Sequence, residues 1–305
     1  MTVTQTMDLL AQLSGQLLSQ QLAQLLVNGI AVGSIIALAA VGLTLTYGIL
    51  RLANFAHGDF LTLGAYLTLL ANGFGINIWL AVILGVVGTI LAVLLTEKLL
   101  WSPMRDRRAS STTLIIISIG LALFLRNGII LFWGGGNQNY DLPVAAAVSV
   151  LGIRIAYYRL IVVGLAILVI LGLHYLLQNT KIGKAMRAVA DDIDLARVSG
   201  INVDQVVIWT WVIAGSLTAL GGGMYGLITA VRPNMGWFLI LPMFAAVILG
   251  GIGNPYGAIA GALIIGIAQE VSTYWLPTEY KLGVALLIMV LVLLVRPQGL
   301  FKGTI

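Results

Sequence analysis

Long runs of apolar residues, separated by short polar loops, dominate this sequence. A helix needs roughly 20 apolar residues to cross a bilayer, and six of the runs reach that length. Three other stretches are less regular, and the first two of them are short and edged by polar or Gly-rich sequence. We therefore predict an all-α, polytopic transmembrane helical bundle with about eight to nine membrane segments, some of them broken or re-entrant. The regular runs are 27–50, 78–96, 112–133, 160–177, 206–231 and 282–295 with its flanks, and the irregular ones are 59–73, 238–250 and 258–275.

The first 26 residues follow a different pattern. Leucines recur there at helical spacing, and a second stripe consists of glutamines, which indicates an amphipathic helix at the membrane interface. The alternative is an extension of the first crossing. No basic region or cleavage site marks a signal peptide. We expect an amphipathic N-terminal segment, 1–26, and a transmembrane domain, 27–305. The glutamines are Gln12, Gln16, Gln20 and Gln24.

The composition agrees with a chain that is solvated by lipid. Only 9% of the 305 residues are charged and 60% are hydrophobic, whereas soluble domains carry about 25% charged residues. This excludes soluble enzymes, nucleic-acid binders and secreted modules. The 36 glycines suit close helix packing in a bilayer. With no Cys and two His, the chain offers no disulfides and is a poor candidate for a metal site.

The basic residues predict which loops lie in the cytoplasm, because Lys and Arg accumulate on that side. Ten of the sixteen occur in three segments. We expect the loops 97–111 and 178–205 and the C-terminus to be cytoplasmic, and the Gly- and Asn-rich loop 134–159 to be external. The ten residues are Lys98, Arg105, Arg107, Arg108, Lys181, Lys184, Arg187, Arg197, Arg296 and Lys302.

Two passages, 54–67 and 250–263, resemble each other. Each is a Gly/Asn break followed by a short helix with small residues. Interrupted apolar segments in two halves of a transporter point to its pathway, although Gly-rich membrane sequences also resemble one another by chance. The residues that we expect along a translocation pathway are Asn54, Phe55, His57, Gly58, Gly64, Gly250, Gly251, Gly253 and Asn254.

Charged groups in membrane segments are costly and need an explanation. His57 and Asp59 could form a base and its orienting carboxylate, but no Ser or Cys nucleophile accompanies them. A turn in which Asp59 caps the next helix is the preferred interpretation. We expect Arg126 to snorkel to the interface. Glu270 either faces an interface or carries a proton in a secondary carrier.

The loop 178–205 is too polar to insert and too long for a simple turn. Its composition predicts short helices over 184–190 and 191–199, with acidic residues near a helix N-terminus and Gly200 at a helix end. A structured helical loop of this kind suits docking of another protein. An ordered loop that packs on its own chain is the alternative.

Three motifs together resemble the shorter permease subunit of branched-chain or neutral amino-acid ABC importers. They are residues 54–58 (Asn-Phe-Ala-His-Gly), residues 183–202, and residues 246–253 (Ala-Val-Ile-Leu-Gly-Gly-Ile-Gly), and the likeness extends from about 27 to 301. The resemblance implies that the loop docks in a cleft of an ATPase subunit. The matching positions that take this coupling role are Gly183, Arg187, Ala188, Asp191, Ala196, Gly200, Ile201 and Asn202.

The resemblance also implies a bacterial inner-membrane location and three kinds of protein partner. These are a second homologous permease, two ABC ATPases and a periplasmic amino-acid-binding protein, while the composition already predicts contact with membrane lipid. No G-x-x-x-x-G-K-[ST] loop occurs in the chain, so ATP hydrolysis is expected in the partners, with no cofactor, metal or nucleic acid here. Urea or short-amide import is the alternative substrate class, and a stand-alone proton-coupled carrier is the alternative mechanism.

Overall fold

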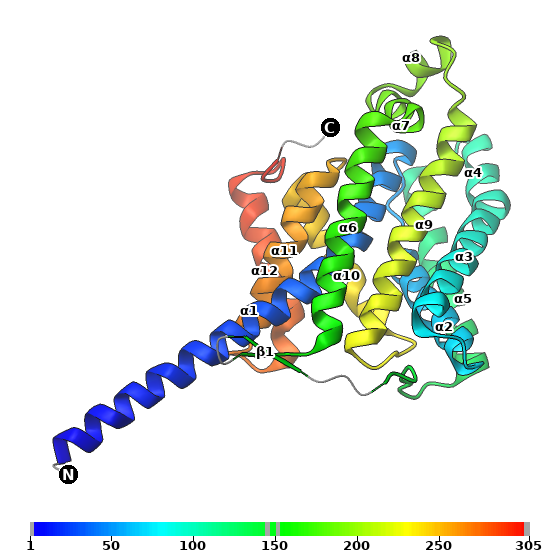
Figure 1. Ribbon diagram of the computed structural model, residues 1–305. Helices are drawn as coiled ribbons and strands as arrows, with labels where there is room; N and C mark the ends of the chain where they lie inside the picture. Colours follow the sequence, from blue (N-terminus) through cyan, green and yellow to red (C-terminus); the bar gives the residue numbers. More distant parts are fainter. Residues whose placement is uncertain (1–2, 144–146, 151–152, 302–305) are drawn as a thin grey trace.

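Nine helices of 15 residues or more form the bundle within the described part of the chain (Figure 1). The computed structural model describes residues 3–143, 147–150 and 153–301, with side chains from residue 20 onward except at 150 and 153. The nine helices are α1 (Val3–Leu50), α2 (His57–Gly73), α3 (Ile78–Thr96), α5 (Ser111–Trp133), α6 (Tyr157–Asn179), α9 (Val203–Ile228), α10 (Met235–Gly250), α11 (Pro255–Ser272) and α12 (Lys281–Val295).

Each predicted apolar segment coincides with one of these helices. The boundaries agree within three residues, apart from the start of α1, which begins at Val3 and continues without interruption to Leu50. Among the described residues, six helical stretches are long and apolar enough to cross a membrane, and Met235–Gly250 is a shorter apolar helix. The predicted fold class, a polytopic helical membrane bundle, is confirmed.

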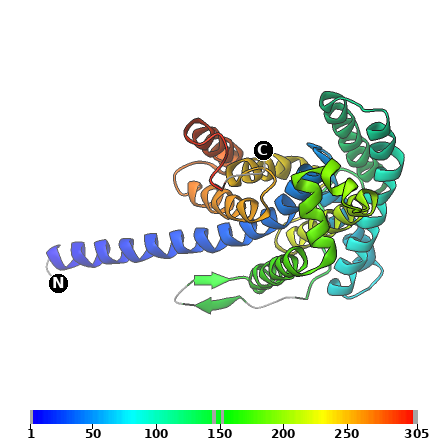
Figure 2. The same ribbon diagram turned by 90° about the horizontal axis from the view of Figure 1, so that it is seen from above.

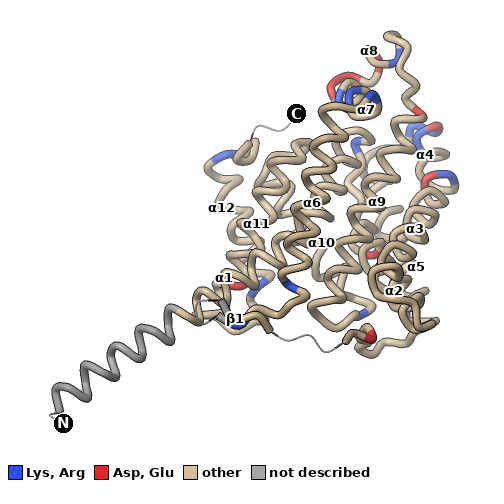
Figure 3. Tube along the Cα trace, viewed as in Figure 1, with Lys and Arg blue, Asp and Glu red and all other residues tan. Residues whose placement is uncertain are grey.

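Short elements mark the two ends of the bundle. The π-helix η1 (Glu97–Trp101) and α4 (Ser102–Asp106) continue α3, so helical structure occupies much of the predicted loop 97–111. They lie at the same end as α7 (Lys181–Asp191) and α8 (Ile193–Val198), which we call the basic end (Figures 1 and 3).

The opposite end carries the antiparallel hairpin of β1 (Val148–Val150) and β2 (Ile153–Ile155), together with the 3-10 helix η2 (Thr278–Tyr280). We call it the hairpin end. The predicted arrangement of loops matches this division, since α12 ends at the basic end (Figure 1), directly before Arg296. Lys302 lies outside the described residues.

The centre of the bundle is made by α9 and by residues 20–50 of α1, which are mostly buried, whereas α5, α6 and α12 bury few of their residues. Seen from above, α11 and α12 lie on one side of α1 and α3 to α5 on the other (Figure 2). Small residues allow the central helices to approach closely. A Cβ on Gly29 of α1 would lie 2.6 Å from the Ile267 backbone of α11. The apolar side chains exposed on the outer helices suit contact with lipid.

Candidate functional site

The loop 178–205 forms a capped helical arm at the basic end. Thr180 caps α7 by accepting from the Gly183 N–H over 3.0 Å, and Asp192 caps α8 through two bonds of 2.9 Å. Gly200, at φ +84°, then reverses the chain in a conformation that suits glycine. Asn202 caps α9 by accepting from the Gln205 N–H over 3.0 Å. The predicted pair of short helices is therefore present, and its caps connect the arm to α6 and α9.

The eight predicted coupling residues divide into three groups by burial. Gly183 and Ala196 are buried within the chain, and a Cβ on Gly183 would lie 2.2 Å from the Leu176 carbonyl of α6. These two set the packing of the arm. The exposed members are Arg187, Asp191, Gly200 and Asn202, and the half-buried ones are Ala188 and Ile201.

The arm presents apolar side chains that its own bundle does not cover. Leu195 is 63% exposed and Val198 81% exposed, and Ile193 beside them is also exposed. Arg187 on α7 donates to the Gln178 side chain over 2.7 Å. In Figure 1 α8 is at the tip of the basic end, beyond the ends of the neighbouring helices. An exposed apolar patch beyond the bundle is characteristic of a protein-docking surface.

The first break in the chain is shorter than predicted. It ends at Ala56, and His57, Gly58 and Asp59 already belong to the first turn of α2, so the expected turn around these three residues is wrong. Asn54 makes the break by accepting from the Ala56 N–H over 3.0 Å. This local side-chain bond competes with helix formation and separates α1 from α2.

His57 is a structural residue that joins three helices. Its ring is 2% exposed, and Nε2 lies 2.9 Å from the Ala39 carbonyl of α1 and 2.8 Å from the Thr218 hydroxyl of α9. A carbonyl only accepts, so Nε2 must carry the proton. Thr218 donates its own hydrogen to the Ala214 carbonyl over 2.7 Å. Nothing in this arrangement pairs His57 with Asp59 as base and orienting acid.

Asp59 pairs instead with Arg126, and the snorkelling expected of Arg126 is wrong. The guanidinium of α5 turns inward and donates to both carboxylate oxygens over 3.1 and 3.2 Å. Its carbon lies 4.7 Å from the centre of the Trp237 ring on α10. The carboxylate does not cap α2, whose N-cap Ala56 has no side-chain cap bond. A buried charge of each sign is more stable paired than alone, which explains the inward turn.

The second break, at 251–254, lies between α10 and α11. Gly251 and Gly253 adopt φ of +104° and +87°. Asn254 accepts from the Tyr256 N–H over 3.0 Å, as Asn54 accepts from Ala56 in the first break. In both breaks an Asn side-chain oxygen therefore accepts a hydrogen bond from the backbone N–H two residues later. The two passages that resemble each other in sequence share this hydrogen bond.

The predicted pathway residues lie mainly at helix contacts. Gly58 of α2 faces Gly236 of α10, where a Cβ would lie 2.3 Å from the Gly236 carbonyl, and Gly64 lies against Ala219 of α9. Gly250 lies against Gly257 across the second break. Phe55 packs on the Phe244 ring of α10, with ring centres 4.9 Å apart.

These residues do not converge on one cavity. Gly253 donates from its N–H to the Thr44 hydroxyl of α1 over 2.9 Å. It also lines a cavity of about 90 Å³ together with Arg187 of the arm. That cavity is where a predicted coupling residue and a predicted pathway residue come together.

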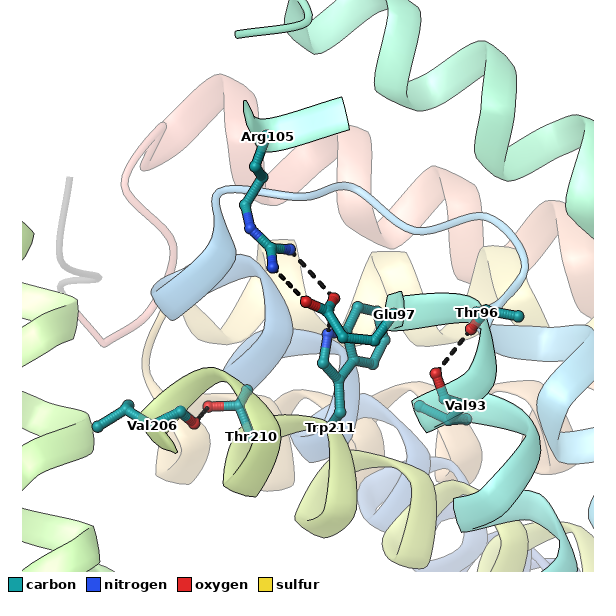
Figure 4. Close-up of polar contacts among 7 residues, drawn as sticks. All are labelled: Val93, Thr96, Glu97, Arg105, Val206, Thr210 and Trp211. Carbon is teal, nitrogen blue, oxygen red and sulfur yellow. Dashed lines mark hydrogen bonds and ion pairs between the residues drawn. The ribbon is translucent and has the colours of Figure 1, made fainter. Parts of the chain in front are cut away.

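A polar cluster at the basic end was not foreseen from the sequence (Figure 4). Glu97 of η1 is buried and accepts from the Trp211 indole N–H of α9 over 2.6 Å. Arg105 of α4 donates to the same carboxylate with two nitrogens, one of them over 3.1 Å. The Trp101 and Trp211 rings stack with centres 6.3 Å apart. The cluster ties the end of α3 to α9, close to where α9 receives the arm.

A cavity with a volume of about 480 Å³ lies at the hairpin end. It opens among α1, α6, α9, α10, α11 and α12. Glu270 of α11 accepts from the Lys281 ammonium of α12 over 2.5 Å on its wall. Because the Glu270 carboxylate already has a cationic partner, the structure does not support its alternative role as a proton carrier.

Known proteins resemble this chain over most of its length. Residues 25–293 match the family described as "Branched-chain amino acid transport system / permease component". The chain is 33% identical to the high-affinity branched-chain amino acid transport system permease protein LivH of Escherichia coli, over 91% of this chain and 94% of the relative. The corresponding protein BraD of Pseudomonas aeruginosa is 30% identical over the same shares.

A third relative and a solved structure also match about 90% of this chain. The probable branched-chain amino acid transport permease LivH of Methanocaldococcus jannaschii is 32% identical over 90% of this chain and 91% of the relative. PsaBC from Streptococcus pneumoniae in complex with Fab has a TM-score of 0.50 at 14% identity, over 90% of this chain and 92% of that one. The latter likeness concerns the fold alone. On the family match and the curated relatives, the chain belongs to the permease family of branched-chain amino acid transport systems.

Proposed function

We propose that this chain is the permease subunit of an ABC importer that carries neutral and branched-chain amino acids across the bacterial inner membrane. ATP is hydrolysed by separate ATPase subunits at the basic end, which lies in the cytoplasm. A periplasmic amino-acid-binding protein delivers the substrate at the hairpin end, and a second homologous permease completes the pathway. This chain supplies part of the translocation pathway and the contact that couples it to the ATPases, and it carries out no covalent chemistry.

The observation that carries the proposal is the capped arm of α7 and α8. A loop that packed only on its own chain would bury its apolar side chains, whereas Leu195 and Val198 of α8 are exposed. At the same time Gly183 fixes the arm on α6, and Asn202 begins α9 directly after it. These features support docking of a soluble subunit on α8 and transfer of its movement to the crossings.

The Glu97 cluster offers the next step of that transfer. α9 continues from the arm into the centre of the bundle, and Trp211 binds it to η1 and thereby to α3. A movement of the arm therefore acts on α6, α9 and α3 together. A rocking motion of packed helices of this kind is the usual way in which transporters alternate their access.

The choice of amino acids as substrate rests on the relatives, whose names state branched-chain amino acid transport. Urea and short amides are the alternative class. A competition assay separates the two classes. In vesicles that contain the complete transporter, leucine and alanine are expected to displace labelled leucine, and urea is not. Displacement by urea and not by leucine or alanine would contradict the substrate assignment.

The docking role is tested by co-purification of the tagged chain from its native membrane in mild detergent, followed by mass spectrometry. P-loop ATPases and a second permease are expected. Gly200→Trp is expected to lose the ATPases, because Gly200 is exposed on the arm at φ +84°. Arg187→Glu, also on the exposed side of the arm, is expected to do the same.

Gly75→Trp is the matched control, since Gly75 has φ +80° and open space around it but lies between α2 and α3 at the other end. It is expected to retain the ATPases. Recovery of the ATPases with the Gly200 variant, or uptake by the isolated chain without ATP, would contradict the proposal.

A further inference from the structure

We propose that the cavity at the hairpin end binds one free amino acid as a zwitterion, so that the permease holds a substrate site of its own. This inference rests on the proposed function, because it takes the substrate class from it. The site would receive the amino acid before the crossings rearrange.

The size and the lining of the cavity suit such a ligand. Its volume of about 480 Å³ falls in the range of roughly 300–1,000 Å³ that is usual for small-molecule sites. Four of its six helices, α1, α9, α10 and α12, contribute apolar side chains against which a branched aliphatic group can pack. These apolar lining residues are Val32, Ile228, Phe238, Leu239, Pro242 and Leu282.

The charged groups on the wall are of both signs and balance each other. Arg159 and Lys281 are positive, and Glu270 and Glu279 are negative. A zwitterion, with one carboxylate and one ammonium, introduces no net charge into such a cavity. A monovalent cation or anion would disturb the balance, and urea would give the Arg159 guanidinium no ionic partner.

Arg159 is the group that we assign to the substrate carboxylate. It lies at the start of α6, and its Nη1 donates to the Asn28 side-chain oxygen of α1, which orients the guanidinium. No carboxylate of the described residues lies within salt-bridge distance of it. A guanidinium has five N–H donors, so donors are left for a bidentate contact with a carboxylate.

Glu270 is the group that we assign to the substrate ammonium. Lys281 occupies only its Oε1, and in the described part of the chain nothing donates to Oε2. A carboxylate oxygen accepts well from an ammonium. The Lys281 contact then holds the carboxylate in place while the second oxygen is offered to the cavity.

Two residues of α10 that line the cavity leave one backbone acceptor of this helix without its usual donor. Pro242 lies inside this helix, and a proline has no N–H to donate to the carbonyl four residues before it. That carbonyl belongs to Phe238, and both residues line the cavity. An acceptor that lacks its helical donor is tolerated in a membrane protein where it lines a cavity, and it is a second partner for an ammonium.

The cavity lies at the end of α9, the helix that is proposed to transmit the movement of the arm. Tyr225, Ile228 and Thr229 line it from the end of α9, and the other end of α9 receives the arm at Asn202. One rigid helix therefore reaches from the docking surface to the cavity. Displacement of α9 by the arm would change the cavity directly.

The test measures binding of labelled L-leucine to the purified full chain in detergent, without the binding protein. Leucine is expected to bind. The acid 4-methylpentanoate and the amine 3-methylbutylamine, which each keep one of the two charges, are expected to compete poorly. Arg159→Gln is expected to weaken leucine binding about tenfold or more, because a charge-assisted contact is lost, and Arg159→Lys is expected to restore part of it.

Arg154→Gln is the matched control, since Arg154 is an exposed arginine of β2 at the same end and does not line the cavity. It is expected to leave leucine binding unchanged. Gel filtration and thermal unfolding show that the variants are folded. Equal leucine binding by the Arg159→Gln and Arg154→Gln variants would overturn the proposal, as would no binding by the parent chain.

Two further measurements distinguish an amino-acid site from a lipid site, and failure of the site from failure of the proposed function. Phosphatidylethanolamine also carries an ammonium and an anion, and leucine binding that disappears when this lipid is added would reassign the cavity to a lipid headgroup. Uptake of leucine by the complete transporter, with no leucine binding by the permease, would remove the site and leave the proposed function standing. Binding by the permease without uptake would keep the site and remove the proposed function.

Discussion

The Arg126 guanidinium of α5 holds both carboxylate oxygens of Asp59 on α2, in a pair that is 15% exposed on the Arg side and 1% exposed on the Asp side. The pair links α2 to α5, and its two residues are 67 positions apart in the sequence. Trp237 of α10 lies under the guanidinium and adds a third helix. Because Asp59 has no other partner of opposite charge among the described residues, the pair fixes how α5 packs on the centre of the bundle.

Removing one partner of this pair is expected to destabilise the protein. Arg126→Met leaves a buried carboxylate alone, which costs about 3 kcal/mol of unfolding free energy. The double variant Asp59→Asn, Arg126→Met leaves no unpaired charge, and its loss is expected to be smaller than that of Arg126→Met. The free energy of unfolding in mixed micelles measures both. Arg126→Met with the stability of the parent would contradict the importance of the pair.

The nine apolar segments were predictable from the sequence because their signal is local. Each run is continuous and apolar, its ends carry polar or Gly-rich residues, and a membrane helix satisfies its own backbone hydrogen bonds. The helix α3, for example, spans Ile78–Thr96, the range expected from its apolar run. The helices of the arm were predictable for a similar reason, since Asp192 and Gly200 carry the signals of a helix start and a helix end.

The partners of the polar residues were not predictable in the same way. Hydropathy shows that Arg126 interrupts an apolar run, but it does not show on which side of the helix a partner lies. Asp59, an acidic residue in another membrane segment, was the signal that could have suggested the pair. Glu97 gave no comparable signal, since it was counted in a polar loop, and its partner Trp211 lies in a segment more than 100 residues away.

The contact between Gly58 and Gly236 is expected to tolerate no side chain. A Cβ on Gly236 would lie 1.8 Å from the Gly58 carbonyl, so Gly236→Ala must push α10 away from α2. Overpacking of this kind costs about 1–3 kcal/mol or more. Thermal unfolding is expected to show the loss.

Gly120→Ala is the matched control for this substitution. Gly120 lies within α5 with nothing near the position of a Cβ, and alanine is the better helix former by about 0.5–1 kcal/mol. The control is expected to be at least as stable as the parent. If both alanine variants unfolded alike, the close approach of α2 and α10 would not matter to stability.

Trp211 is expected to contribute to stability through its N–H as well as through its size. Trp211→Phe keeps an aromatic ring but leaves the buried Glu97 carboxylate with one donor fewer, at a cost of about 1–3 kcal/mol. Trp209→Phe on the same helix is the control, because Trp209 is 42% exposed, and its change is expected to stay within about 0.5 kcal/mol. Denaturant unfolding followed by circular dichroism compares the two, and equal effects would refute a role for the Glu97 bond.

The exposed apolar side chains of α8 are expected to affect coupling without affecting stability. Leu195→Ser and Val198→Ser each change a side chain that the chain itself does not cover, so the free energy of unfolding is expected to stay within about 0.5 kcal/mol of the parent. In the assembled transporter, the ATP hydrolysis that substrate stimulates is expected to fall, because these two side chains would be buried against the ATPase. Val148→Ser is the control, since Val148 is an exposed apolar residue of β1 at the hairpin end. Stimulated hydrolysis that is unchanged by both α8 variants, at full assembly, would place the docking surface elsewhere on the basic end.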